Sequence, residues 1–248
     1  MEAWDLALAA SGSFVAGLLG SAVGLVLGSL RLPVILVASG SPAAAAGTNI
    51  AVSAVAALAG GIAHARAGRV DWSLVRWMTP PSVAAAFVGG YFAHLLPKGL
   101  LLGAIAAVLF WSGLDLLLGL RAEPGAPRRP RVTAALAGGL IGLLGGAVGL
   151  VLGTLRLPAL IRGSGLVAHR AVGTNLVVGF FLGVFGFLGH LAQAEVEWAV
   201  LGVSLSGAIP GSLVGARVTG KLSESALRRA IGAVLVVVAA AIAVSAAR

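Results

Sequence analysis

A stretch of fourteen residues occurs twice in this chain. GSAVGLVLGSLRLP begins at Gly20 and GGAVGLVLGTLRLP begins at Gly145, and twelve of the fourteen aligned residues are identical. A second match follows at almost the same spacing, because AAAGTN ends at Asn49 and RAVGTN ends at Asn175. A long internal repeat constrains the architecture more than any local pattern, since both copies are expected to form the same structural unit. The sequence therefore predicts two homologous halves.

Both copies lie within long apolar runs. Of the 248 residues, 59% are hydrophobic and 10% are charged, whereas about a quarter of the residues of a soluble domain are charged. Several runs are long enough to cross the roughly 30 Å hydrocarbon layer as helices. The net charge of +9 comes from basic residues at the ends of these runs. This placement is typical of loops retained on the cytoplasmic side of a membrane, and it explains the charge better than nucleic-acid binding does. We expect an all-α, multi-pass protein of the cell (inner) membrane.

The predicted boundaries follow the repeat. The first transmembrane repeat spans residues 1–121, a basic, proline-rich linker spans 122–131, and the second repeat spans 132–248. Each repeat is predicted to contain four transmembrane helices, about eight in all, and one broken or re-entrant segment. The distribution of basic residues leaves two arrangements open. An even number of crossings makes the repeats parallel, whereas the opposite placement of basic residues in the second half favours inverted repeats, as in many secondary transporters.

Each half is divided in the same way. The first apolar run extends from Leu6 to Leu30, or from Ala134 to Leu155, and a short segment bounded by Pro and Gly follows it. Further helices are expected after Ala43 and Val167, after Trp72 and Trp198, and near Gly99 and Leu227. Glycines at every fourth position predict one smooth face on the first helix of each half for close packing; they are Gly20, Gly24, Gly28, Gly145, Gly149 and Gly153.

One arginine in each copy lies near the interruption. Arg31 and Arg156 each stand two residues before a proline. An arginine at the centre of a membrane helix costs about 2.5–3.5 kcal/mol unless it is compensated. A bound oxyanion would compensate it, because a planar guanidinium grips an oxyanion with two hydrogen bonds. The alternative is that both side chains reach outward to the lipid headgroups.

The GTN motifs complete the predicted anion site. We expect a new helix to begin close to each motif, so that backbone N–H groups, side-chain hydroxyls and amides donate to an anion between the two halves. The alternative is that Thr and Asn only cap local helices. The predicted substrate-binding residues are Arg31, Arg156, Gly47, Thr48, Asn49, Gly173, Thr174 and Asn175.

Three titratable residues are candidates for ion coupling. Asp115 is the one acid inside an apolar run, so it is either a proton carrier or the partner of a buried arginine, or it lies near the interface. His64 and His190 occupy matched positions at helix ends, where a histidine either couples proton movement or faces the interface. Arg162, near the second interruption, either attracts anions or is an ordinary loop charge.

Signatures of enzymes are missing from the sequence. It contains no HExxH, GxSxG or GxxxxGK[ST] motif and no cysteine. We therefore expect a protein that is not an enzyme and has no cofactor or metal. The expected partners are a small anionic substrate and the lipid bilayer, with proton or sodium coupling and a homo-oligomer as further options, and no nucleic acid.

The ordered motifs of both halves resemble a known family. AGTNIAVSAVAALAGGIAHARAGRVDW, from Ala46 to Trp72, and VGTNLVVGFFLGVFGFLGHLAQAEVEW, from Val172 to Trp198, are similar to the TauE/SafE sulfite-exporter-like permeases. The resemblance covers nearly the whole chain. It implies an inner-membrane permease for sulfur-containing or organic anions, with ion coupling. The family commonly has G-x-G-G-G before the proline, where this chain reads GLVLG followed by SLRLP or TLRLP.

These observations together favour a secondary transporter. We predict an ion-coupled permease or exporter for a small anion such as sulfite or an organosulfonate, with the binding site between the two broken segments. A passive anion channel and a membrane scaffold that transports nothing are the alternatives.

Overall fold

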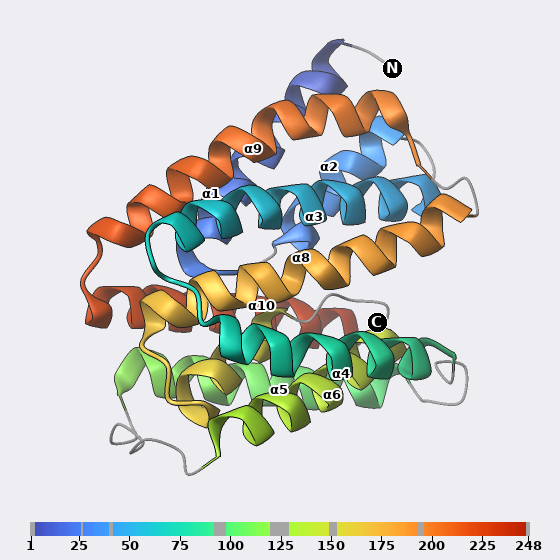
Figure 1. The fold of residues 1–248 in the computed structure, drawn as a ribbon. Helices are drawn as coiled ribbons and strands as arrows, with labels where there is room; N and C mark the ends of the chain where they lie inside the picture. Colours follow the sequence, from blue (N-terminus) through green and yellow to red (C-terminus); the bar gives the residue numbers. More distant parts are fainter. Residues whose placement is uncertain are drawn as a thin grey trace. The chain divides into compact units, whose positions relative to one another are not determined.

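The computed structural model describes residues 3–25, 27–39, 42–91, 98–119, 129–148, 153–192 and 196–246. All regular elements within these ranges are helical, which confirms the predicted all-α class (Figure 1). In chain order they are α1 (Ala3–Val23), α2 (Gly28–Ser39), α3 (Pro42–Arg66), α4 (Trp72–Tyr91), α5 (Lys98–Leu118), α6 (Pro130–Val148), α7 (Gly153–Pro158), the π-helix η2 (Ala159–Gly163), α8 (Ala168–Ala192), α9 (Trp198–Lys221) and α10 (Glu224–Ala246).

Five of the described helices are long and apolar enough to cross a membrane. These segments are Trp4–Val23, Ala44–Arg66, Ala168–Leu188, Trp198–Lys221 and Glu224–Val244. Shorter apolar segments lie in α5 and α6, at Ile105–Leu118 and Pro130–Leu144. The structure thus agrees with a multi-pass membrane protein, while the total of eight crossings stays a prediction.

The chain forms two compact units that each draw on both halves of the sequence. Unit 1 contains Met1–Val70 and Val172–Lys221, and unit 2 contains Asp71–Ala171 and Leu222–Arg248. Compactness in space therefore does not follow the boundaries predicted from the repeat. The division into repeats at 1–121 and 132–248 stays a statement about sequence.

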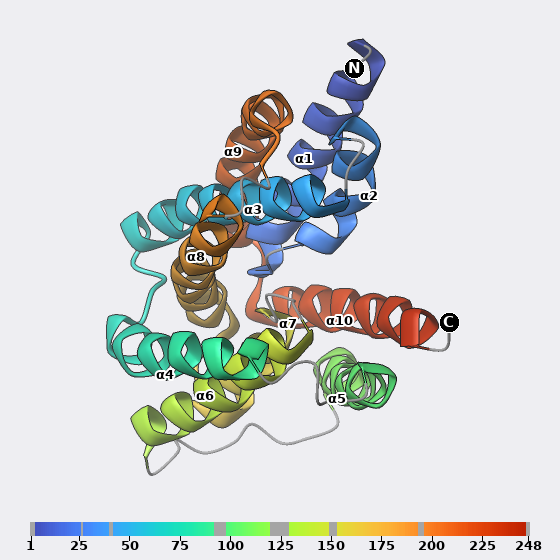
Figure 2. The same cartoon turned by 90° about the vertical axis from the view of Figure 1, so that its right-hand side faces the viewer.

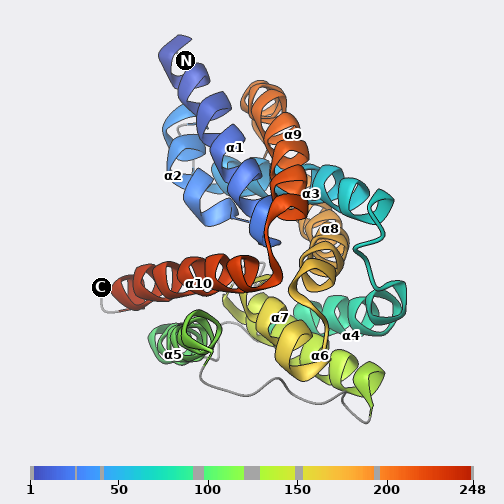
Figure 3. The ribbon, with the colours of Figure 1, turned by 90° about the vertical axis from the view of Figure 1, so that its left-hand side faces the viewer.

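In unit 1, α1 packs along α9, as the blue and orange helices of Figure 3 show. The hydroxyl of Thr219 on α9 donates to the carbonyl oxygen of Ala22, near the end of α1, over 2.8 Å. Helix α2 adds Ile35 to a buried core shared with Ala9 of α1 and Val52 of α3. Added side chains on three glycines of α9 would collide with backbone carbonyls of α1; they are Gly207, Gly211 and Gly215.

In unit 2, α4 packs along α6 and α5 packs on α10 (Figure 2). The approach is close at both contacts, because a Cβ on Gly138 of α6 would lie 2.7 Å from the carbonyl oxygen of Met78. A Cβ on Gly113 of α5 would lie 2.8 Å from the carbonyl oxygen of Gly232 on α10. Small residues thus permit close helix packing here, as is common in membrane proteins.

The first helix of the first half ends earlier than the sequence predicts. Helix α1 ends at Val23, where the N–H of Leu25 donates to the carbonyl oxygen of Gly20 over 2.7 Å. Gly24 has a φ of +73°, a conformation that costs residues with a Cβ roughly 1–2 kcal/mol. The predicted glycine face at Gly20, Gly24 and Gly28 is therefore wrong, since Gly20 lies within α1, Gly24 makes the turn and Gly28 begins α2. The matching face in the second half includes Gly149, which lies outside the described residues.

The short segments after the interruptions are helices of their own. Helix α2 continues through Pro33, so the proline does not end the helix that carries Arg31. In the second half, α6 ends at Val148 and α7 starts at Gly153, and the π-helix η2 follows Pro158 directly. The predicted continuous helix from Ala134 to Leu155 includes residues 149–152, which lie outside the described residues, so it stays a prediction. Arg31 lies on α2, which follows the interruption in the first half, and Arg156 lies on the short helix α7.

Candidate functional site

Arg31 is buried in unit 1, and its hydrogen-bond partners among the described residues are all neutral groups. Its exposed fraction is 2%. Its Nε donates to Oδ1 of Asn49 over 3.0 Å, and its Nη2 donates to the carbonyl oxygen of Asn49 over 3.1 Å and to Oγ of Ser53 over 2.6 Å. No carboxylate among the described residues pairs with it. Arg31 is therefore a buried cation held by uncharged acceptors.

Local sequence explains how α2 and α3 place these groups. Asn49 and Ser53 are four residues apart on α3, so their side chains lie on the same face. Nδ2 of Asn49 donates to the carbonyl oxygen of Gly28, the first residue of α2, over 3.1 Å. A Cβ at Gly28 would lie 2.8 Å from Oγ of Ser53. A glycine at this point thus lets the start of α2 approach the polar face of α3.

A small cavity of about 10 Å³ lies beside Arg31. Polar groups on its wall come from α1, α2, α3 and α9, and they belong to Ser21, Arg31, Ser53 and Ser212. Ser21 is 2% exposed, and its hydroxyl has no hydrogen-bond partner among the described residues. A polar cavity of roughly this volume holds about one water molecule. The site thus offers a guanidinium and hydroxyl groups to a ligand in a small space.

The GTN motifs lie inside helices, so the expectation that a helix begins at each motif is wrong. Helix α3 begins at Pro42 and α8 begins at Ala168. The backbone N–H groups of residues 47–49 and 173–175 lie beyond the first turn of a helix, where such groups donate to carbonyls four residues earlier. These residues therefore offer side chains to a ligand, not the unpaired backbone donors of a helix start.

The side chains of both motifs connect helices within unit 1. Oγ1 of Thr48 accepts a hydrogen bond from the N–H of Glu197, just before α9, over 2.9 Å. Nδ2 of Asn175 donates to the carbonyl oxygen of Gly24 over 2.7 Å. Gly47 and Thr174 are buried. An added Cβ on Gly173 would collide with the carbonyl oxygen of Arg69. Among the described residues, Asn49 is the member of these motifs that forms hydrogen bonds with Arg31.

Arg156 is also buried, with an exposed fraction of 1%. It lies on α7 in unit 2, whereas Arg31 lies on α2 in unit 1. Neither side chain faces outward, so the alternative in which both reach the headgroups is wrong. That the two arginines grip one anion stays a prediction.

The ion-coupling candidates have different surroundings. His64 is fully buried in unit 1, with Nε2 3.2 Å from the carbonyl oxygen of Ser21, so it does not face the interface. The side chain of His190 lies outside the described residues. Asp115 forms an ion pair with Arg162, with Oδ2 3.0 Å from Nε. A role in ion coupling stays a prediction for all three.

For Arg162 the sequence left two options open, attraction of anions and an ordinary loop charge. Arg162 lies on the π-helix η2, and its side chain is 15% exposed, while that of Asp115 is 4% exposed. The sequence did contain a signal for this ion pair, because it places an acid within one apolar run and an arginine beside the second predicted interruption. Buried charges are expected to be paired, but distance along the chain conceals which charges meet.

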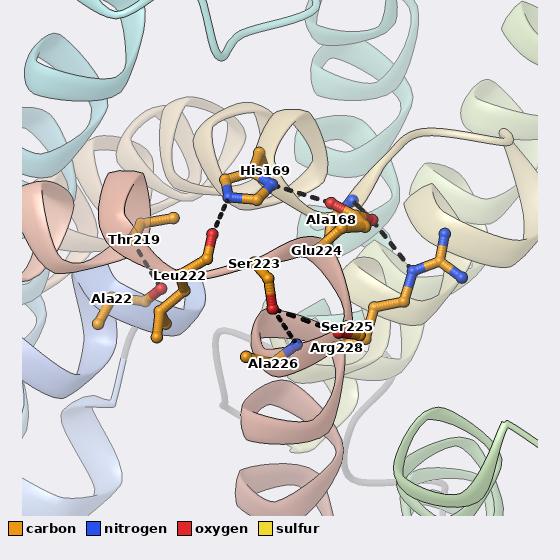
Figure 4. A network of polar contacts seen from close by, with 10 residues as sticks. All are labelled: Ala22, Ala168, His169, Thr219, Leu222, Ser223, Glu224, Ser225, Ala226 and Arg228. Atoms are coloured by element: carbon orange, nitrogen blue, oxygen red, sulfur yellow. Dashed lines mark hydrogen bonds and ion pairs between the residues drawn. The ribbon is translucent and has the colours of Figure 1, made fainter.

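A second polar network was not predicted. Figure 4 shows His169, whose Nδ1 is 2.9 Å from Oε2 of Glu224 and whose Nε2 is 3.1 Å from the carbonyl oxygen of Leu222. Oε1 of Glu224 accepts hydrogen bonds from the N–H of Ala168 over 2.5 Å and from Nε of Arg228 over 3.0 Å. The network ties the start of α8 to the start of α10.

The structure combines apolar helices of membrane length with short helices and with a buried arginine beside a polar cavity. These features are those of a multi-pass membrane protein of the transporter class. The family model "Sulfite exporter TauE/SafE" matches residues 9–242. The chain therefore belongs to the TauE/SafE family of membrane transporters, as its motifs predict.

Relatives in several bacteria agree with this assignment. A "Probable membrane transporter protein" of Xylella fastidiosa (strain Temecula1) is 30% identical over 236 residues, covering 90% of both chains. A protein of the same description from Haemophilus influenzae is 25% identical and covers 94% of this chain and 95% of its own. The "Probable membrane transporter protein YdhB" of Bacillus subtilis is 26% identical, with coverage of 75% and 79%. No solved structure matches this chain.

Proposed function

We propose that this chain is a secondary transporter for a small oxyanion such as sulfite, and that the cavity beside Arg31 is part of its anion site. The observation that carries the proposal is the buried guanidinium of Arg31, which has neutral partners alone among the described residues. A buried charge without a counter-charge is costly, and a bound anion supplies that counter-charge.

The chemistry of the cavity wall supports an oxyanion. Guanidinium N–H groups and serine hydroxyls donate hydrogen bonds to the oxygens of a small anion. The family description names sulfite export, and sulfite presents oxygen acceptors of this kind. The narrowness of the cavity supports a carrier over an open channel, because a space for about one water does not admit continuous anion flow. Transport then requires a second conformation in which this site opens.

The test is sulfite flux in proteoliposomes that contain the purified chain. Arg31→Gln removes the charge and is expected to lower the flux at least about tenfold, since hydrogen bonds to charged groups contribute roughly 1.5–3 kcal/mol. Arg217→Gln is the matched control, because Arg217 is an exposed arginine of α9 in the same unit. Wild-type flux in a folded Arg31→Gln protein would refute the role of this arginine.

The same assay tests ion coupling. Imposed proton or sodium gradients of either sign are expected to drive sulfite against its own gradient, because a coupled carrier transmits the free energy of one gradient to the other. Flux that never saturates and ignores both gradients would instead indicate a passive channel. Absence of flux with every anion tested would favour a membrane scaffold.

A further inference from the structure

Arg69 lies in the turn between α3 and α4 and belongs to unit 1. The N–H of Arg69 donates to the carbonyl oxygen of His64 over 2.9 Å, and Gly68 just before it has a φ of +69°. The carbonyl oxygen of Arg69 lies so close to α8 that a Cβ on Gly173 would collide with it. Contacts with α3 and α8 therefore fix the backbone from which the Arg69 side chain extends.

The guanidinium of Arg69 lies against the end of α9. A Cβ on Gly220 would lie 3.3 Å from Nη1 and 3.6 Å from Nη2 of Arg69. Nη1 is buried, and neither a hydrogen bond nor an ion pair of this side chain occurs among the described residues. Burial lowers the pKa of Arg69, because its charge loses hydration that no described group replaces. Buried polar atoms normally have a partner, so a group outside this chain is expected to supply it.

The charged residues closest to Arg69 in unit 1 are basic. Arg66 lies three residues earlier in the chain, and Arg217 and Lys221 lie near the end of α9, on either side of Gly220. The side chains of these three basic residues are exposed. Helices α3 and α9 pack side by side (Figure 3). This end of unit 1 therefore has a positive potential that attracts anions.

The acids described in unit 1 lie at its other end. Asp5 is in the first turn of α1, and Glu197 directly precedes α9. Helix α1 runs parallel to α9, because successive glycines of α9 approach successive turns of α1. Asp71, two residues after Arg69, forms an ion pair with Arg170, with Oδ2 3.1 Å from Nη2. The described carboxylates thus leave the counter-charge of Arg69 to a ligand.

Arg69 also lies at the ends of two membrane-length segments. The segment Ala44–Arg66 ends three residues before it, and the segment Trp198–Lys221 ends one residue after Gly220. The ends of spanning helices lie at the head groups of the bilayer, outside the hydrocarbon layer of roughly 30 Å. Basic sites between helices at this depth bind lipid head groups. Position and charge therefore both favour a phosphate group as the missing partner.

We propose that Arg69 binds the phosphate group of an anionic phospholipid between the α3–α4 turn and Gly220. Two phosphate oxygens accept hydrogen bonds from Nη1 and Nη2, which is the paired geometry that a guanidinium offers to an oxyanion. The acyl chains lie along the apolar helices that end here. Inorganic phosphate presents the same oxygens without acyl chains, so the experiment separates the two sources. This inference does not rest on transport of sulfite or on the cavity beside Arg31.

Thermal unfolding of the full chain in dodecyl maltoside micelles tests the proposal, because these micelles contain no phosphate. Phosphatidylglycerol is expected to raise the Tm saturably, since a ligand that binds the folded state alone stabilises it. Diacylglycerol with the same acyl chains is the comparison without phosphate and is expected to leave the Tm unchanged. The second arm adds inorganic phosphate, with chloride at equal ionic strength as its comparison. Equal stabilisation by inorganic phosphate and by phosphatidylglycerol at the same concentration overturns the assignment to a lipid, and no rise in either arm overturns the phosphate site.

Arg69→Gln removes the charge and the paired donors. We expect the phosphatidylglycerol concentration at half of the full Tm rise to increase at least about tenfold. Without lipid the variant is expected to unfold at or above the wild-type Tm, because no described hydrogen bond of this side chain is lost. The matched control is Arg66→Gln, which removes an exposed charge three residues away and is expected to change that concentration at most about threefold, since exposed charges are screened. Equal effects of the two variants overturn the proposal.

Gly220→Leu tests the same site without changing any charge. The new side chain occupies the space beside Nη1 of Arg69, so phosphatidylglycerol is expected to bind more weakly. The matched control is Gly202→Leu on the same helix, where an added Cβ would meet nothing within 4 Å. The effect of leucine on helix stability is then common to both variants. Wild-type binding of phosphatidylglycerol by Gly220→Leu overturns the placement of the phosphate at Gly220.

Discussion

Helices α1 and α9 both contribute to the wall of the cavity beside Arg31, and Gly17 lies at the contact between these two helices. Gly17 lies on α1 and lines this cavity. A Cβ at this position would lie 2.6 Å from the carbonyl oxygen of Ala208 and 3.1 Å from Oγ of Ser212. The first of these groups is backbone, so it cannot rotate away. Gly17→Ala therefore forces α1 and α9 apart.

Two opposing effects determine how much Gly17→Ala changes the free energy of unfolding. Replacing Gly by Ala within a helix stabilises it by about 1 kcal/mol, whereas overpacking a well-packed contact costs about 1–3 kcal/mol. Gly12→Ala separates them, because Gly12 lies on the same helix and its Cβ would have only an ordinary 3.5 Å contact with Cγ2 of Val34. The stabilisation that alanine gives to the helix is the same in both variants, so it cancels when their stabilities are compared. Gly17→Ala is expected to be about 1–3 kcal/mol less stable than Gly12→Ala.

Thermal unfolding of the purified variants in one detergent measures this difference. For a chain of this size each kcal/mol corresponds to about 2–4 °C, so the Tm of Gly17→Ala should lie about 2–12 °C below that of Gly12→Ala. Sulfite flux should fall in Gly17→Ala and not in Gly12→Ala, because only the first displaces a wall of the cavity. Equal Tm values for the two variants would refute the packing described for α1 and α9.

Two further predictions concern the same unit. Ser53→Ala removes the acceptor of the 2.6 Å hydrogen bond from Arg31, so the free energy of unfolding should fall by about 1.5–3 kcal/mol. Denaturant titration measures this loss. The comparison is Ser73→Ala, because the hydrogen bond between the Ser73 hydroxyl and Arg131 is exposed. Gly24→Ala should lower the Tm more than Gly68→Ala does, because both glycines have a positive φ but only a Cβ on Gly24 would meet another group, Val172 Cα at 2.6 Å. An equal loss of Tm in both would mean that backbone conformation alone limits position 24.

Sequence alone was sufficient for features that depend on neighbouring residues. Long apolar runs require helices in a membrane, because a helix satisfies every backbone hydrogen bond within itself. The expected helix starts near Ala43, Val167, Trp72 and Trp198 agree with α3, α8, α4 and α9. The family was identified correctly from the order and duplication of the motifs. An interruption was also predicted in the first half, although its position was set too late by several residues.

The tertiary structure decided which distant groups meet. Whether Arg31 faces lipid or protein depends on α3 lying against α2, and no local pattern specifies that contact. The pairing of Asp115 with Arg162 likewise depends on packing between α5 and η2, which are more than forty residues apart in the sequence. Helix formation is local, since each hydrogen bond spans four residues, whereas burial and charge pairing depend on segments brought together by the fold. The polar contacts of Arg31 and of Asp115 therefore became visible only in three dimensions.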